Sequence, residues 1–210
     1  MVRRGTWSDG DRQTSEPSDR RKKLLMKLAY IIFNGITWLD LIGVYEPVSK
    51  LKSGKHIPEL DWDLCSFTET AADIFGLSVK AHKIKNDLKN YDAIIVPGGI
   101  GTRELQYDES FLDWIKTAGS CKYKISICTG SLILGAAGFL KGKKATTNFN
   151  EYEALQPYCG EVVKTRIVDD QCTITAGAVS ASIDLGLYLC QLWANSDVAG
   201  GIRKHIDYHG

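Results

Sequence analysis

The chain has 210 residues, of which 44% are hydrophobic and 24% charged, a composition typical of a soluble globular protein with one core. Its formal net charge of +1 gives no electrostatic case for binding nucleic acid or an anionic membrane, so neither is expected as a partner. No run of about 18 or more apolar residues occurs, and no transmembrane helix is therefore predicted.

The cysteines are scattered along the chain, and no two of them form a CxxC pair. Their spacing therefore predicts neither a zinc site nor a redox-active dithiol. Because no secretory signal is evident, we expect reduced thiols in a cytosolic-type compartment. The six positions are Cys65, Cys121, Cys128, Cys159, Cys172 and Cys190.

Residues 1–23 differ from the rest of the chain because they are polar, charged and without periodicity. We predict that they form a disordered extension. The segment is rich in Arg and contains Ser, as organelle transit peptides do, but such peptides are poor in acids and this one has several. We therefore expect a cytoplasmic protein, with import into an organelle as the alternative.

From Leu24 onward, strand-like and helix-like segments alternate. Short apolar or alternating segments predict strands at residues 27–35, 61–70, 76–84, 91–99, 123–127 and 143–148, and a hairpin around Asp169 and Asp170 within residues 161–177. Helical spacing, in several cases with a glycine stop, predicts helices at residues 37–54, 103–119, 129–140, 150–160 and 180–193.

The alternation of strands and helices predicts an α/β fold. Its sheet is expected to be mostly parallel, with helices on both faces and a small β-hairpin beside it. We find no internal repeat and no linker that divides the chain. Residues 24–210 are therefore predicted to form a single domain.

The stretch "YKISICTGSLILGAAGFL", residues 123–140, changes at Cys128 from an apolar strand to a helix of small residues. Ligands of such sheets bind outside the carboxyl ends of the strands. The N–H groups and positive pole of the helix that starts there are expected to lower the pKa of the thiol. The turn is analogous to a nucleophile elbow. A buried core cysteine is the alternative, and position alone does not decide between the two.

Four segments, running from about Leu28 to Trp193, resemble the ThiJ/PfpI superfamily. They are "FNGITWLDLIGVYEPVS", "DAIIVPGGIGT", "SICTGSLILGAAGFLKGKKATT" and "TITAGAVSASIDLGLYL". Within the superfamily, the chain is most similar to the isonitrile (isocyanide) hydratase subgroup and to the related domains of amidase-like regulators. The resemblance implies a flavodoxin-like three-layer sandwich, a nucleophilic Cys128 and a homodimer.

The resemblance also implies that Asp40, in "TWLDLIG", faces the thiol of Cys128. There it would exchange a proton with sulfur or substrate, which requires a pKa moved toward neutrality by burial. The residues alone favour another interpretation, in which Asp40 starts a helix and complements its macrodipole.

Backbone groups of three loops are candidates for binding substrate. The N–H groups of Gly99 and Ile100, in "PGGIGT", are predicted to bind developing negative charge together with that of Thr129. Thr129 is also a candidate hydrogen-bond partner of a polar substrate atom. By resemblance, the loop "AGAVS" lines the same pocket through Gly177 and Val179.

None of the four histidines lies near Cys128 in the sequence. A protease or amidase of this superfamily normally needs a histidine to activate the cysteine, so a Cys-His hydrolase is disfavoured. Where close relatives often read Thr-Thr-His-Trp, this chain has Asn148, a candidate substrate contact that can hydrogen-bond but cannot titrate.

We therefore predict a cofactor-independent hydro-lyase of the isonitrile hydratase type, acting on a small-molecule substrate. It would convert an isonitrile to an N-substituted formamide through a thioimidate on Cys128, with Asp40 as general acid and base. No metal or organic cofactor is expected.

Two alternatives stay open. One is a glyoxalase or deglycase that acts on reactive aldehydes; it is the weaker enzyme hypothesis, because Glu46 lies two helical turns beyond Asp40 and no histidine stands by the cysteine. The other is a non-catalytic redox or ligand sensor that uses the oxidation or binding chemistry of Cys128.

Overall fold

The computed structural model describes residues 26–210. The disordered extension predicted for residues 1–23 lies outside these described residues. No helix within residues 26–210 is long and apolar enough to cross a bilayer.

A seven-stranded sheet forms the centre of the described part, in the order β10-β11-β7-β6-β1-β2-β5. Every neighbouring pair is parallel except β10 and β11, which are antiparallel. The inner strands are buried on both faces, as expected for apolar runs in a parallel sheet. The strands are β1 Met26–Ile32, β2 Leu60–Ser66, β5 Lys83–Ile84, β6 Ala93–Val96, β7 Tyr123–Ile127, β10 Ile167–Asp170 and β11 Thr173–Ala176.

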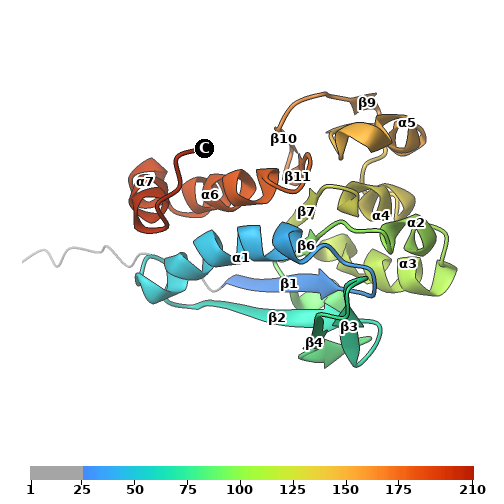
Figure 1. Ribbon diagram of the computed structural model, residues 1–210, viewed down its shortest axis with the longest axis horizontal. Helices are drawn as coiled ribbons and strands as arrows, with labels where there is room; N and C mark the ends of the chain where they lie inside the picture. Colours follow the sequence, from blue (N-terminus) through green and yellow to red (C-terminus); the bar gives the residue numbers. More distant parts are fainter. Residues whose placement is uncertain (1–25) are drawn as a thin grey trace, which may run out of the picture.

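Helices cover the sheet in two groups, which Figure 1 shows on either side of it. One group is α1 Trp38–Ser53, α6 Ala181–Trp193 and α7 Ser196–His205. The other includes α2 Thr102–Leu105, α3 Glu109–Lys116 and α4 Gly130–Ala136. The predicted α/β fold with a mostly parallel sheet and three layers is confirmed.

The two long helices α1 and α6 approach each other closely at a glycine. A Cβ atom added at Gly43 of α1 would lie 2.0 Å from the hydroxyl oxygen of Ser182 on α6. Only the missing side chain permits this distance, because real Cβ contacts are never so short. The close packing fixes α1, and with it the position of Asp40 in the first turn of that helix.

Several predicted elements differ in detail. The predicted helix 103–119 is divided into α2 and α3, because the Oδ1 of Asp108 accepts a hydrogen bond from the N–H of Phe111 and starts a new helix. The predicted helix 150–160 is three short turns: η3 Phe149–Glu151, α5 Tyr152–Leu155 and η4 Gln156–Tyr158.

The strand predictions also need corrections. The predicted strand 61–70 becomes β2 and β3 Thr70–Ala72, and the predicted strand 76–84 becomes β4 Ser78–Lys80 and β5. β3 and β4 pair as a separate small hairpin, whereas the hairpin predicted within residues 161–177 is β10–β11 and belongs to the main sheet. Residues 143–148 supply only β8 Lys144–Ala145, which pairs with β9 Glu161–Val162 outside the main sheet. The turn of the later hairpin lies at Gln171 and Cys172, just after the predicted position.

Candidate active site

The site lies where four neighbouring strands end. In the sheet, β11, β7, β6 and β1 are adjacent and parallel, so their carboxyl ends meet at one edge. The segments that follow them carry Gly177, Cys128, Gly99 and Asp40, respectively. Residues that are far apart in the sequence are therefore brought together by the order of the strands.

Cys128 lies between β7 and α4 with a left-handed backbone conformation, φ 53°. Such a conformation costs a non-glycine residue about 1–3 kcal/mol and persists only where its surroundings impose it. Here the N–H of Cys128 donates to the carbonyls of Ala176 and Gly177 at 3.0 and 2.8 Å. Its own carbonyl accepts hydrogen bonds from the hydroxyls of Ser131 and Thr147. The strained turn places Cys128 where its side chain packs against the core and also lines a pocket.

Asp40 is fully buried in the first turn of α1. Its Oδ2 accepts a hydrogen bond from the N–H of Gly98 at 2.8 Å. A Cβ atom at Gly98 would lie 2.8 Å from this Oδ2, 2.8 Å from the Cβ of Cys128 and 2.7 Å from the N of Thr129. The carboxyl group of Asp40, the Cβ of Cys128 and the backbone N of Thr129 therefore surround Gly98. Among the described residues, the Oδ1 of Asp40 has no hydrogen-bond partner.

Burial dominates the protonation of both groups. It raises the pKa of Asp40 to about 7, although the hydrogen bond from the Gly98 N–H and the neighbouring Cys128 thiol act to lower it. Burial also raises the pKa of the Cys128 thiol, and the negative charge of Asp40 adds to this effect. Hydrogen bonds from Asn148 and Thr129 act in the opposite direction.

The lowered thiol pKa that the sequence suggested is therefore wrong for the resting site. Desolvation and the neighbouring carboxylate outweigh the hydrogen bonds from Asn148 and Thr129. Near neutral pH the sulfur therefore keeps its proton while Asp40 is partly ionised, because two adjacent buried negative charges are costly.

Asn148 is the side chain that donates to the sulfur. Its Oδ1 accepts a hydrogen bond from the N–H of Asn150 at 3.0 Å, and this orients the amide so that Nδ2 lies 3.4 Å from the Sγ of Cys128. The amide thus stabilises the thiolate at the position where relatives often have a histidine.

The other predicted residues have distinct positions. The N–H of Gly99 donates to the Thr129 hydroxyl at 3.0 Å, which ties the two loops together but engages this donor. Ile100 and Val179 line the pocket with Thr129. The carbonyl oxygen of Gly177 accepts a hydrogen bond from the N–H of Cys128.

The pocket itself is small, with a volume of about 200 Å³. No histidine of residues 26–210 lines it. A larger hollow of about 540 Å³ between α1 and α7 is lined by His56 and His205, but it contains no cysteine and lies away from the thiol. The smaller pocket is therefore the candidate active site, because Cys128 lines it. It is lined by Thr37, Gly99, Ile100, Arg103, Cys128, Thr129, Asn148, Asn150, Glu151 and Val179.

Comparison with known proteins identifies the family of the chain. The sequence profile of the DJ-1/PfpI family matches residues 27–192, nearly all of the described part. The chain belongs to the DJ-1/PfpI family. The resemblance noted in the sequence is thereby confirmed.

Among the relatives of this DJ-1/PfpI protein are one characterised by name and one of known structure. Isonitrile hydratase from Pseudomonas putida is 36% identical over 188 residues, covering 88% of this chain and 79% of that protein. The crystal structure of a ThiJ/PfpI family protein from Pseudomonas syringae superposes with a TM-score of 0.80 at 26% identity, covering 95% of this chain and 84% of that chain.

A more distant neighbour shares the fold. Drosophila melanogaster DJ-1beta superposes with a TM-score of 0.75 at 14% identity, covering 89% of this chain and 100% of that chain.

Sequence reasoning missed four residues that line the pocket of this DJ-1/PfpI protein: Thr37, Arg103, Asn150 and Glu151. A signal was available for each. Thr37 precedes the helix of Asp40, Arg103 follows the "GGIGT" loop, and Asn150 and Glu151 closely follow Asn148.

Proposed function

We propose that this DJ-1/PfpI protein is a cofactor-independent hydro-lyase that hydrates isonitriles to N-substituted formamides. The observation that carries the proposal is the buried pair of Asp40 and Cys128, in which the pKa of the carboxyl group is raised to about 7. A carboxyl group with this pKa can donate and accept a proton near neutral pH, as a hydratase without histidine requires. The 36% identity to an isonitrile hydratase supports the choice of substrate.

The first half of the reaction forms a covalent intermediate. The proton of the Cys128 thiol first passes to the ionised Asp40 carboxylate, and the resulting thiolate attacks the terminal carbon of R–N≡C and forms the C–S bond. The carboxylic acid of Asp40 transfers its proton to the same carbon, which gives the thioimidate R–N=CH–S and leaves a carboxylate. The Asn148 amide stabilises the thiolate before attack.

The second half releases the product. Water adds to the thioimidate carbon while the Asp40 carboxylate accepts a proton from it, and this proton passes to the nitrogen. The resulting R–NH–CH(OH)–S intermediate expels the Cys128 thiolate, and its hydroxyl proton returns to Asp40. The sum is R–N≡C plus water giving R–NH–CHO, with the thiolate and the carboxylic acid restored.

The aldehyde hypothesis receives less support. Glu46, the glutamate on the same helix, forms an ion pair with Lys50 at 2.6 Å, and its side chain is about half exposed. It does not line the pocket of Cys128. The carboxyl group available to the thiol is Asp40.

The test is formamide production from methyl isocyanide and cyclohexyl isocyanide by the wild type, Cys128→Ala and Asp40→Asn. We expect turnover by the wild type, and losses of at least about a thousandfold in both variants because each lacks a reacting group. Hydration by Cys128→Ala at the wild-type rate would refute the covalent scheme. Lactate formation from methylglyoxal without isonitrile turnover would instead favour the aldehyde chemistry.

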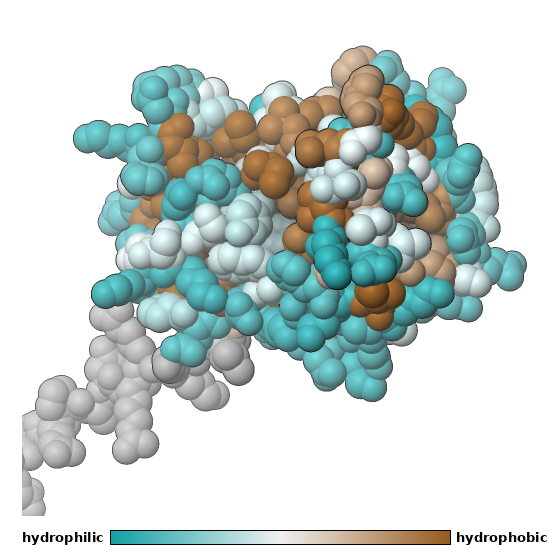
Figure 2. Space-filling view, turned by 60° about the horizontal axis from the view of Figure 1, so that its bottom comes forward, coloured by the Kyte–Doolittle hydropathy of each residue, from teal (hydrophilic) through white to brown (hydrophobic). Residues whose placement is uncertain are grey.

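We also propose that two copies associate through one apolar face. Figure 2 shows exposed hydrophobic side chains, in brown, mainly in the upper half of the face it views. The proposed face combines the outer side of α1, with Leu39 and Ile42, and the tip of the β3–β4 hairpin, with Ile74, Phe75 and Leu77. The Trp38 Nε1 donates to the Leu77 carbonyl and joins the two parts.

A further inference from the structure

The residues that line the pocket can be ordered from floor to mouth by their exposure. Cys128 is 5% exposed and Thr129 is 4% exposed, so both lie at the floor. Ile100 is 50% exposed and the Arg103 side chain 48% exposed, so these two lie at the mouth. A substrate bound to the thiol therefore extends its R group toward Ile100 and Arg103.

An ion pair links two walls of this mouth. Arg103 belongs to α2, which follows the glycine loop 98–101. Glu151 belongs to η3, which follows the sulfur contact Asn148. The Nη2 of Arg103 contacts the Oε1 of Glu151, and the Glu151 side chain is only 18% exposed. One contact thus ties the wall that follows β6 to the wall that contacts the sulfur.

The same pair sets the charge of the mouth. The charges of the guanidinium and the carboxylate cancel. The remaining polar lining side chains besides Cys128 are uncharged: Thr37, Thr129, Asn148 and Asn150. No net charge among the lining residues therefore favours an ionised R group. The pocket volume of about 200 Å³, the ion pair across the mouth and the neutral lining together limit which R groups can extend past the thiol.

We propose that Arg103 and Glu151 are specificity-determining residues, whose ion pair restricts the pocket to isonitriles with short, uncharged R groups and excludes bulky ones. The inference rests on the proposed hydratase function. It concerns the R group alone, because the ion pair contacts neither the sulfur nor the carboxyl group of Asp40.

The first test compares kcat/KM for methyl isocyanide with that for cyclohexyl isocyanide. We expect the wild type to prefer methyl isocyanide, and Arg103→Ala to raise the cyclohexyl-to-methyl ratio about tenfold, as removal of a steric limit does. Glu151→Ala is expected to raise it similarly. If the ion pair sets the preference, either substitution breaks it. The double variant should then show the same ratio as the single variants.

Lys52→Ala provides a control. Lys52 also forms an ion pair between two elements, with Asp61 at 3.1 Å, but neither residue lines the pocket. We expect the cyclohexyl-to-methyl ratio of kcat/KM in Lys52→Ala to equal that of the wild type. An unchanged ratio in Arg103→Ala and Glu151→Ala, with isonitrile turnover intact, would overturn the inference and leave the proposed function standing.

A second readout does not depend on turnover. Alkylation of Cys128 by iodoacetamide, a small reagent, and by N-phenylmaleimide, a bulky one, is followed by mass spectrometry, with Cys172 as the internal reference. Arg103→Ala should accelerate the reaction of Cys128 with the bulky reagent about tenfold more than with the small one. Equal acceleration by both reagents would contradict a size limit. If the wild type does not hydrate isonitriles, the proposed function fails. The alkylation rates still show whether the ion pair limits the size of molecules that reach Cys128.

Discussion

The raised pKa of Asp40 suits proton transfer near neutral pH but lowers the stability of the folded protein. Its pKa rises from 3.8 to about 7 because the folded protein buries the carboxyl group, and the ionised form is therefore penalised in the folded state. Unfolding returns the group to water, where it ionises near pH 4. The folded state binds more protons between these two values, so this group lowers the stability as pH rises from about 4 to about 7.

We predict that Asp40→Asn stabilises the protein at pH 8 by up to roughly 4 kcal/mol, the energy equivalent of that pKa shift. Asparagine keeps an oxygen that accepts the hydrogen bond from Gly98 but carries no charge. Urea unfolding of both proteins at pH 5 and pH 8 measures the effect. The advantage of the variant should grow with pH, and a difference that is constant with pH would contradict the raised pKa.

The central residues of the site could be inferred from the sequence, but their protonation could not. The strand before Cys128 and the helix of Asp40 are visible as patterns, and the carboxyl ends of parallel strands meet by geometry. The pKa of Cys128 depends on burial and on Asp40, which no local pattern reports. The ion pair of Arg103 and Glu151 joins positions 48 residues apart, and only the folded chain reveals it.

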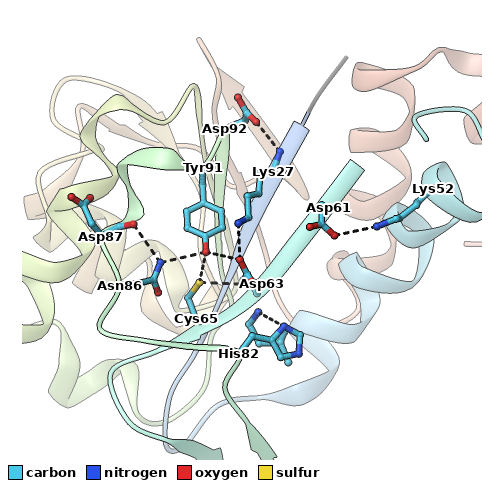
Figure 3. Close-up of polar contacts among 11 residues, drawn as sticks. Lys27, Lys52, Asp61, Asp63, Cys65, His82, Asn86, Asp87, Tyr91 and Asp92 are labelled. Carbon is cyan, nitrogen blue, oxygen red and sulfur yellow. Dashed lines mark hydrogen bonds and ion pairs between the residues drawn. The ribbon is translucent and has the colours of Figure 1, made fainter. Parts of the chain in front are cut away.

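At the scale of elements, a polar network joins β1 and β2 to the segment before β6. Figure 3 shows the Tyr91 hydroxyl between Asp63 and Cys65. It donates to the Oδ2 of Asp63 at 2.8 Å, and the ammonium group of Lys27 lies 3.0 Å from the same oxygen. Although partial burial raises the pKa of Asp63, the Tyr91 hydrogen bond and the Lys27 charge outweigh it and hold that pKa below its ordinary value.

We predict that Tyr91→Phe destabilises the protein by about 1–2 kcal/mol at pH 7, because Asp63 loses a hydrogen bond. A depressed folded pKa contributes stability that is present above the unfolded pKa and is lost as pH falls through the folded pKa. The gap between wild type and variant in urea unfolding should therefore narrow below about pH 4. A gap of equal size at acidic and neutral pH would show that lost packing, not the Asp63 hydrogen bond, is responsible.

Two element boundaries show where sequence patterns fail to predict the structure. The Asp108 cap that divides α2 from α3 is a recognisable signal within a segment whose helical spacing suggested one helix. The hairpin turn at Gln171 and Cys172 has positive φ at both residues, a conformation that glycine and asparagine usually supply. Its position is set by the pairing of β10 with β11. Tertiary pairing overrides local preference there.

At the scale of the whole molecule, the proposed dimer face contains both a projection and a hollow. Phe75, at the hairpin tip, is 89% exposed. Between α1 and the neighbouring strands lies a hollow of about 180 Å³. Its lining is mostly apolar: Trp38, Leu41, Ile42, Tyr45, Trp62, Leu64, Val79 and His82. A projection and a hollow on one face can engage reciprocally about a two-fold axis, which is how an isologous dimer buries such a surface.

We predict that the wild type sediments as a dimer and that Phe75→Asp sediments as a monomer at micromolar concentration, because the charge would have to enter the apolar hollow of the other copy. Tyr107→Asp is the matched control, since Tyr107 is 73% exposed, lies between α2 and α3 and interacts with Tyr158 of η4, which is not part of this face. It should remain dimeric. Sedimentation velocity separates the outcomes. A monomeric wild type, or a Phe75→Asp variant that stays dimeric, would show that the apolar face does not mediate self-association.

Loss of the dimer should also lower kcat/KM for isonitriles, because Thr37 lines the pocket and directly precedes Trp38, which lines the hollow of the dimer face.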